Sequence, residues 1–310
     1  MVVLICPVCR VVDSRCKLTV AGTVTDRVHL VLQRHLRYEQ KDSGYPGDMS
    51  ATECPQAEQL TIADEIPAVV WHGAGDGPHP VVIYMHGGGH TKWDVDPIAL
   101  ELIPSQGVTL LSFDLWMHGD RIPPSGKPTE RTADRLLTSM ERCSADLFTI
   151  LDYVRSNPEM DSDHLGLHGY SHSSNVALVA LGMNLRVHAC LSIAGAGDLA
   201  ALFAYLAHQH DIPSGQIAQE MQREHDRFMR INPLHHVDSF SPCAIMMIHG
   251  LHDVLAPFSA HFALYQALLP HYRSKPGDCL FVAHADGHWT PDAVKRMGFS
   301  WLAERLTSAR

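Results

Sequence analysis

Gly169-Tyr-Ser-His-Ser173 lies directly between a predicted strand, His164-Leu-Gly-Leu-His168, and a predicted helix that runs from Ser173 to Met183. A tight turn from a strand into a helix lifts one side chain clear of the sheet, and its neighbours must be small because the turn crowds them. The usual pattern for such a turn is G-x-S-x-G, and here Ser173 stands in place of the second glycine. Serine is still small, so the stretch predicts Ser171 as a nucleophile.

Short apolar runs alternate with segments of helical periodicity on both sides of this turn. The runs predict strands at 80–85, 108–113, 188–194, 244–248 and 279–283, and the periodic segments predict helices at 135–155, 257–269 and 291–306. Regular alternation of strands and helices predicts the α/β class, with a mostly parallel sheet covered by helices on both faces.

Serine is a poor nucleophile unless a base takes its proton and an acid orients that base. Asp253 follows the predicted strand 244–248, and His288 follows the predicted strand 279–283. Both residues are therefore expected on loops at the carboxyl edge of the sheet, where Ser171 is expected too. Asp286 is an alternative acid because it neighbours His288, although its position suits a loop contact better.

The run His86-Gly-Gly-Gly89 follows the predicted strand 80–85. Consecutive glycines let the backbone turn its N–H groups toward a substrate without side chains in the way. Such donors are needed because a tetrahedral intermediate carries negative charge on the former carbonyl oxygen. The run matches the glycine motif that forms the oxyanion hole of lipases and esterases.

The order serine, acid, histidine and the glycine motif together resemble the α/β hydrolases, over residues 60–308. The stretches Asn232–Val237 and His249–Asp253 are most similar to the dienelactone-hydrolase and prolyl-oligopeptidase-like esterases. The resemblance implies an α/β-hydrolase fold and a catalytic triad of Ser171, Asp253 and His288. It also implies one oxyanion donor from the backbone of His172 and one from Gly87, Gly88 or Gly89. No cofactor and no metal are implied.

Residues 197–236 interrupt the alternation with a polar, helical stretch between two predicted strands. An insertion at this point is expected over the carboxyl edge, as a small helical cap on the hydrolase domain. The alternative is an extended crossover packed on the sheet. Four aromatic residues near the predicted active-site loops are candidates for lining an apolar acyl pocket: Trp93, Trp116, Phe203 and Trp289.

Composition limits the partners and the location. The 310 residues carry a net charge of −10, which disfavours nucleic-acid binding, and no apolar run is long enough to span a bilayer. Residues 1–55 carry seven Lys/Arg against six Asp/Glu, whereas residues 56–310 carry 17 against 28. We therefore interpret 1–55 as an N-terminal extension and linker of unknown role, 56–310 as the hydrolase domain, and the default location as cytoplasmic.

These features predict a serine hydrolase that cleaves a small-molecule carboxylic ester through an acyl-enzyme. The short cap favours short- to medium-chain acyl groups over long ones. One alternative is a serine peptidase or acylaminoacyl hydrolase on short peptides. An alternative of another class is a non-catalytic binding protein on a hydrolase scaffold. The sequence leaves the oligomeric state open.

Overall fold

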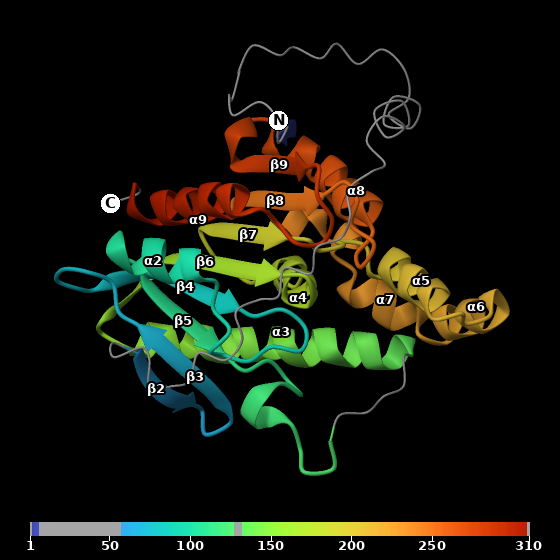
Figure 1. The fold of residues 1–310 in the computed structure, drawn as a ribbon, viewed down its shortest axis with the longest axis horizontal. Coiled ribbons are helices and arrows are strands. Elements are labelled where there is room, and N and C mark those ends of the chain that lie inside the picture. The colour runs from blue at the N-terminus through green and yellow to red at the C-terminus, as the bar shows by residue number, and fades with distance from the viewer. Residues whose placement is uncertain (1, 6–56, 127–131, 309–310) are drawn as a thin grey trace.

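One nine-stranded sheet runs through the protein in the computed structural model, which describes residues 2–5, 57–126 and 132–308 (Figure 1). The strand order is β1-β9-β8-β7-β6-β4-β5-β3-β2. Strand β3 pairs antiparallel with β2 and with β5, and all other pairs are parallel. The strands are β1 (Val2–Ile5), β2 (Ala57–Ile62), β3 (Ile66–Trp71), β4 (His79–Met85), β5 (Thr109–Phe113), β6 (Met160–Tyr170), β7 (Ala189–Ile193), β8 (Ala244–Gly250) and β9 (Cys279–His284).

Helices cover both faces of this sheet. A hydrophobic core lies on each face of the sheet. Helices α3, α4 and α8 pack in one core, and α2 and α9 pack in the other. Neighbouring residues of β4 point to opposite cores, with Val81 and Ile83 on the first face and Val82 on the second. The mostly parallel α/β architecture is thereby confirmed. These helices are α2 (Pro97–Ser105), α3 (Ala133–Ser156), α4 (His172–Gly182), α8 (Phe258–Leu268) and α9 (Asp292–Thr307).

Local sequence sets the ends of the longest helix, α3. The side chain of Thr132 accepts a hydrogen bond from the backbone N–H of Arg135 at 3.2 Å, which caps the first turn. The helix ends at Ser156, and Asn157 is its C-cap. Pro158 follows directly, and a proline cannot continue a helix. None of the helices in the described ranges is long and apolar enough to cross a membrane.

The carboxyl ends of the parallel strands meet at one edge of the sheet. Met85 at the end of β4 pairs with Gly169 of β6, and Gly250 at the end of β8 pairs with His284 of β9. The chain leaves β4 toward β5 on one side and β6 toward β7 on the other, so the strand order reverses between β4 and β6. Ligands of open α/β sheets bind in the crevice at such a reversal.

Three helices fill the predicted insertion at 197–236: α5 (Leu199–Gln209), α6 (Ser214–Arg223) and α7 (His225–Ile231). They lie beyond the carboxyl edge of the sheet (Figure 1) and pack mainly against α3 and α8. Arg227 fixes α7 to α3 through ion pairs with Asp134 at 2.6 Å and Glu141 at 2.7 Å.

The N-terminal prediction falls mostly on residues outside the described ranges. Only Val2–Ile5 is described there, and it forms β1, which pairs in parallel with β9 at the edge of the sheet. The remaining short elements are 3₁₀ turns: η1 (Gly119–Arg121), η2 (Pro233–His235), η3 (Val237–Ser239), η4 (Leu269–Tyr272) and η5 (Pro276–Asp278).

Candidate active site

Ser171 occupies the turn between β6 and α4 in a strained backbone conformation. Its φ of 56° and ψ of −114° lie where residues with a side chain are rarely found. The turn also brings Gly169 against the backbone of Ser173, because a Cβ at Gly169 would lie 2.4 Å from the carbonyl oxygen of Ser173. The glycine is therefore required for the turn that presents the Ser171 hydroxyl.

Ser173 accounts for the departure from the usual glycine pattern. Its buried hydroxyl donates to the carbonyl of Met85 at 2.9 Å and accepts the backbone N–H of Tyr170 at 2.9 Å. The side chain thus ties the Ser171 turn to the end of β4, the neighbouring strand.

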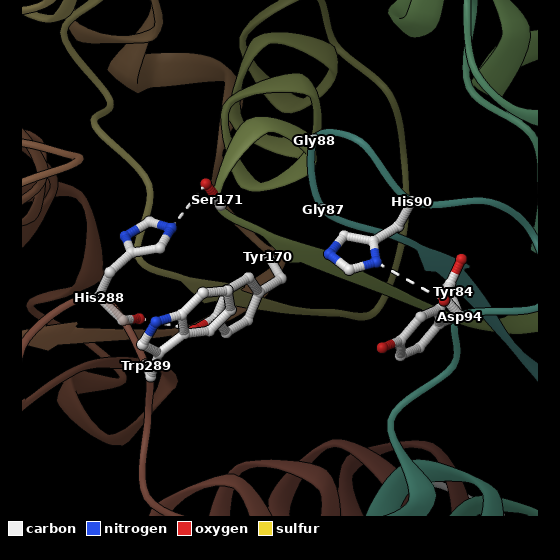
Figure 2. Close-up of a pocket in the computed structure, with 9 residues that line it drawn as sticks. All are labelled: Tyr84, Gly87, Gly88, His90, Asp94, Tyr170, Ser171, His288 and Trp289. Atoms are coloured by element: carbon white, nitrogen blue, oxygen red, sulfur yellow. Dashed lines mark hydrogen bonds and ion pairs between the residues drawn. The ribbon is translucent and has the colours of Figure 1, made fainter. Parts of the chain in front are cut away.

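Ser171, His288 and Asp253 form a hydrogen-bonded series (Figure 2 draws the first two). His288 Nε2 lies 2.9 Å from Ser171 Oγ, and His288 Nδ1 lies 2.7 Å from Asp253 Oδ2. A carboxylate only accepts hydrogen bonds, so Nδ1 carries the proton and Nε2 is free to accept the Ser171 proton. The sequence reasoning named these three residues, and the fold brings them together.

The carboxylate of Asp253 is held ionised inside the protein. Burial alone would raise its pKa, but hydrogen bonds from His249 and His288 outweigh burial and hold the pKa of Asp253 well below its usual range. Its other oxygen accepts the backbone N–H groups of Leu255 and Ala256 at 2.8 and 2.9 Å. Asp286, the alternative acid, is instead half-exposed and faces His284 at 3.7 Å.

Backbone contacts fix the two loops that carry Asp253 and His288. A Cβ at Gly250 would lie 2.0 Å from the carbonyl oxygen of Gly287, so the loops are in direct contact. The Tyr170 hydroxyl, next to the nucleophile, donates to the carbonyl of His288 at 2.6 Å. One tyrosine therefore joins the nucleophile turn to the histidine loop.

The glycine loop after β4 lies against the nucleophile turn. Gly87 and Gly88 line a pocket with Ser171, and a Cβ at Gly88 would lie 3.6 Å from Cβ of His172. Gly89, which has a φ of 87°, does not line this pocket. Of the three glycines predicted as candidate donors, Gly87 and Gly88 line the pocket with Ser171.

His86 holds the start of this loop. Its Nδ1 donates to the carbonyl of Gly87 at 2.8 Å, and its Nε2 accepts the backbone N–H of Leu115 at 3.2 Å. Burial lowers the pKa of His86 to about 3, so the ring stays neutral and keeps this arrangement near neutral pH.

A buried lysine holds the end of the loop. Lys92 is 2% exposed, and its Nζ contacts Asp114 at 2.9 Å and Asp120 at 2.6 Å. Asp114 also accepts the backbone N–H of Lys92 at 2.8 Å. Burial would lower the pKa of Lys92, but the hydrogen bonds to Asp120 and Asp114 raise it overall, so the lysine is charged.

The pocket beside Ser171 has two chemically different walls (Figure 2). Tyr170 and Trp289 stack with ring centroids 6.3 Å apart and form the aromatic wall. His90 and Asp94, with Nδ1 and Oδ1 3.6 Å apart, form the polar wall opposite, together with Tyr84. The arrangement can hold a small acyl compound with its reacting carbonyl between Ser171 and the glycine loop.

Of the four aromatic residues predicted to line the pocket, only Trp289 does so. Trp93 packs edge to face on Trp71 at 6.4 Å, and Trp116 packs against the core shared with α3 and α4. Phe203 is buried against Phe228 at 6.3 Å.

Comparison with known proteins identifies the family of this chain. The model of the prolyl oligopeptidase family matches residues 138–306, which is more than half of the chain. The chain belongs to the prolyl oligopeptidase family. It is therefore a serine hydrolase with the α/β-hydrolase fold, and the expected kinship with this group is confirmed.

Two solved structures show the same fold as this prolyl oligopeptidase family member over most of the chain. TT1662 from Thermus thermophilus is 20% identical, with a TM-score of 0.63 over 81% of this chain and 98% of that one. Acetyl xylan esterase 1 from a Thermoanaerobacterium species is 16% identical, with a TM-score of 0.58 over 83% of this chain and 90% of that one. The thiohydrolase aneE of Aspergillus aculeatus is 27% identical over 119 residues, which are 38% of this chain and 35% of that relative's length.

Sequence reasoning missed several residues of the site. Tyr170, His90 and Asp94 line the pocket, and all three lie within five residues of a recognised motif. That proximity is a usable signal, although it does not say which way a side chain points. Lys92 carried no signal at all, because a lysine is normally expected at the surface.

Proposed function

We propose that this prolyl oligopeptidase family member is an esterase that uses Ser171, His288 and Asp253 as a catalytic triad. Ser171 Oγ attacks the carbonyl carbon of the ester while His288 Nε2 takes its proton. His288 then gives the proton to the leaving alcohol, and the acyl group stays on Ser171. Water deacylates the serine by the same steps, and Asp253 stabilises the imidazolium each time. The observation that carries this proposal is the continuous hydrogen-bonded series from Ser171 to Asp253.

The oxyanion of the tetrahedral intermediate is stabilised by backbone N–H groups in this proposal. Gly87 and Gly88 and the first residue of α4, His172, are adjacent to Ser171. Donors of this kind lie at a helix N-terminus and in a glycine loop, where no side chain blocks the substrate oxygen. Removing one such donor typically slows kcat by about 100- to 1,000-fold.

Short- to medium-chain acyl esters are the substrate class that the pocket favours. The aromatic wall of Tyr170 and Trp289 suits an apolar group, while the His90–Asp94 wall suits a polar one. Trp289 is 51% exposed, so the aromatic wall opens to solvent instead of closing into a long channel. We therefore expect a compact acyl group on an alcohol of moderate size.

Hydrolysis of nitrophenyl esters from acetate to palmitate tests the proposal, with Ser171→Ala as the paired variant. We expect the wild type to favour the short chains and Ser171→Ala to lose about 10⁶-fold in kcat, as when a serine nucleophile is removed elsewhere. Turnover of these esters that survives Ser171→Ala would overturn the assignment of the nucleophile. A folded wild type with no turnover of any ester would overturn the esterase assignment.

Thioester hydrolysis is a second candidate because one relative is named a thiohydrolase. Peptide hydrolysis is a third because the family is named for a peptidase. An acyl thioester and an aminoacyl anilide, each compared with the nitrophenyl ester of the same acyl group, separate the three activities. The highest Ser171-dependent kcat/KM identifies the bond that the site is built for.

A further inference from the structure

A second histidine contacts the acid of the site. His249 Nε2 lies 3.3 Å from Asp253 Oδ2, the same oxygen that holds His288. The same Nε2 lies 3.2 Å from the carbonyl oxygen of Ala256. Both neighbours are acceptors only, so Nε2 of His249 must carry a proton and donate it.

This assignment fixes the protons of the next three residues in turn. We assign one proton to the His249 ring, so its Nδ1 is an acceptor and the Nδ1 of His261, 3.0 Å away, donates to it. The Nε2 of His261 then accepts from the Ser192 hydroxyl at 2.9 Å. The Ser192 oxygen in turn accepts from Ser174 at 2.5 Å. In each of these hydrogen bonds, the donor is the group farther from Asp253 along the series.

The series closes on the nucleophile's own helix. His249 lies next to the last residue of β8, His261 on α8, Ser192 on β7, and Ser174 on α4 three residues after Ser171. All four side chains are fully buried, at 0% exposure. Phe258 and Phe281 pack edge to face on the histidine rings. The acid and the nucleophile are thus linked twice, once through His288 and once through the interior.

Burial makes the neutral form of the His261 ring the stable one. It lowers the pKa of His261 well below the usual histidine value, and the neighbouring His249 adds to this effect. A neutral His261 keeps one donor and one acceptor nitrogen, which the assignment above requires.

We propose that His249 is a positioning residue for the reaction, held in place by His261, Ser192 and Ser174. Its hydrogen bond keeps the Asp253 carboxylate in the plane and at the distance that His288 needs. This inference rests on the proposed function, since it assigns His249 a role only through the triad acid. Outer partners that orient an active-site group typically change activity by about 10- to 100-fold when they are lost.

Two substitutions at His249 separate orientation from packing. We expect His249→Phe, which keeps a ring but loses the donor, to lower kcat by about 10- to 100-fold with KM within about twofold. His249→Gln restores an N–H near the position of Nε2 and should recover most of this loss. His168→Phe is the matched control, because His168 is also a buried histidine of the central sheet and neither ring nitrogen has a hydrogen-bond partner.

A double-mutant cycle with Asp253→Asn tests whether His249 acts through the acid. Asp253→Asn alone is expected to cost about 10⁴-fold in kcat, which leaves measurable turnover of nitrophenyl acetate. In this background His249→Phe should change kcat by less than about threefold, because the carboxylate that it orients is gone. Equal losses from His249→Phe in both backgrounds would overturn the inference.

The outcomes distinguish this inference from the proposed function. If Ser171→Ala abolishes turnover but His249→Phe leaves kcat unchanged, the triad stands and the inference fails. If Ser171→Ala keeps its turnover, the proposed function itself fails. If His249→Phe does not fold, the same cycle is run with His249→Gln against His249→Leu.

Discussion

Tyr170 shows how one residue beside the nucleophile serves both the pocket and the backbone. Its ring stacks on Trp289 in the aromatic wall, and its hydroxyl donates to the carbonyl of His288 at 2.6 Å. The first x of G-x-S-x-G can be any residue in the pattern, yet here Tyr170 at this position fixes the loop that carries His288.

Tyr170→Phe should lower kcat while leaving the pocket in place. The ring remains, but the His288 loop loses a hydrogen bond worth about 1 kcal/mol, which corresponds to a several-fold loss in kcat. Tyr272→Phe is the matched control, because the Tyr272 hydroxyl also donates to a carbonyl at 2.6 Å, that of Cys243, away from the pocket residues. We expect the control to lower the free energy of unfolding but not kcat. Equal kcat values for both variants would contradict a role of Tyr170 in holding the base.

The sequence did not indicate correctly which aromatic side chains line the pocket. Ser171, Asp253 and His288 were found because each follows a strand in a short motif, and the sheet brings strand ends together. Trp93 lies four residues after Gly89, yet its ring packs on Trp71. Nearness to a motif along the chain does not determine the direction of a side chain, which depends on contacts across the fold.

The glycine loop after β4 is an element held at both ends by buried groups. His86 bonds to Leu115 at its start, and Lys92 pairs with Asp114 at its end. The segment 114–121 after β5 therefore serves as the support for the loop. Arg121 belongs to this segment and pairs with Asp146.

Lys92→Met should reduce both stability and kcat. Removal of the lysine leaves the buried Asp114 carboxylate without its cation, a change that typically costs about 3–5 kcal/mol in the free energy of unfolding. The loosened glycine loop should also lower kcat. Urea unfolding and ester turnover measure the two effects.

Arg296→Ala provides the comparison for Lys92→Met, because Arg296 pairs with Glu101 where both side chains are exposed. Loss of this surface pair should lower the free energy of unfolding far less than loss of Lys92 does and should leave kcat unchanged. An equally small cost for Lys92→Met would show that the Lys92–Asp114 contact does not hold the loop.

The buried strands and the long helices were predictable, and the edge elements were not. Strands β4, β5, β7, β8 and β9 match predicted runs to within two residues at either end because apolar residues fill them between turn residues. Strand β2 has exposed positions, and β3 contains Pro67, so neither gives a clear run. Helix α2 contains Pro104, which normally argues against a helix.

Across the whole molecule, buried neutral histidines are a source of acid sensitivity. His86, His168, His261 and His284 are each at most 2% exposed, and burial lowers the pKa of every one of them. The pKa values of His86 and His168 fall to about 3. In the unfolded chain each would titrate near the ordinary value of about 6.5.

The sign of the pH effect follows from these directions. Between about pH 3 and pH 6.5 the unfolded chain binds protons that the native protein does not, so acid favours unfolding. Stability should be intact above about pH 6.5, and His86 and His168 should each lower it by about 1.4 kcal/mol per pH unit as pH drops. Urea unfolding at about pH 7.5 and about pH 5 measures the loss.

His168→Phe should make the protein less acid-sensitive. Its loss of stability between those two pH values should be smaller than that of the wild type by about 2 kcal/mol, because one buried titrating group is gone. His225→Gln, at an exposed position, should behave as the wild type does. The same loss in His168→Phe as in the wild type would contradict the assignment of acid sensitivity to buried histidines.

The hydrogen bond from the Ser173 hydroxyl to Met85 has a consequence for finding hydrolases in genome sequences. The second residue after the nucleophile must be small and must contact the end of the neighbouring strand. Ser173 makes this contact through its side-chain hydrogen bond to the Met85 carbonyl. A search that insists on glycine there passes over this chain and over any homologue with the same replacement. Allowing serine at that position, when a strand precedes it and a helix follows, widens the set of recognisable hydrolases.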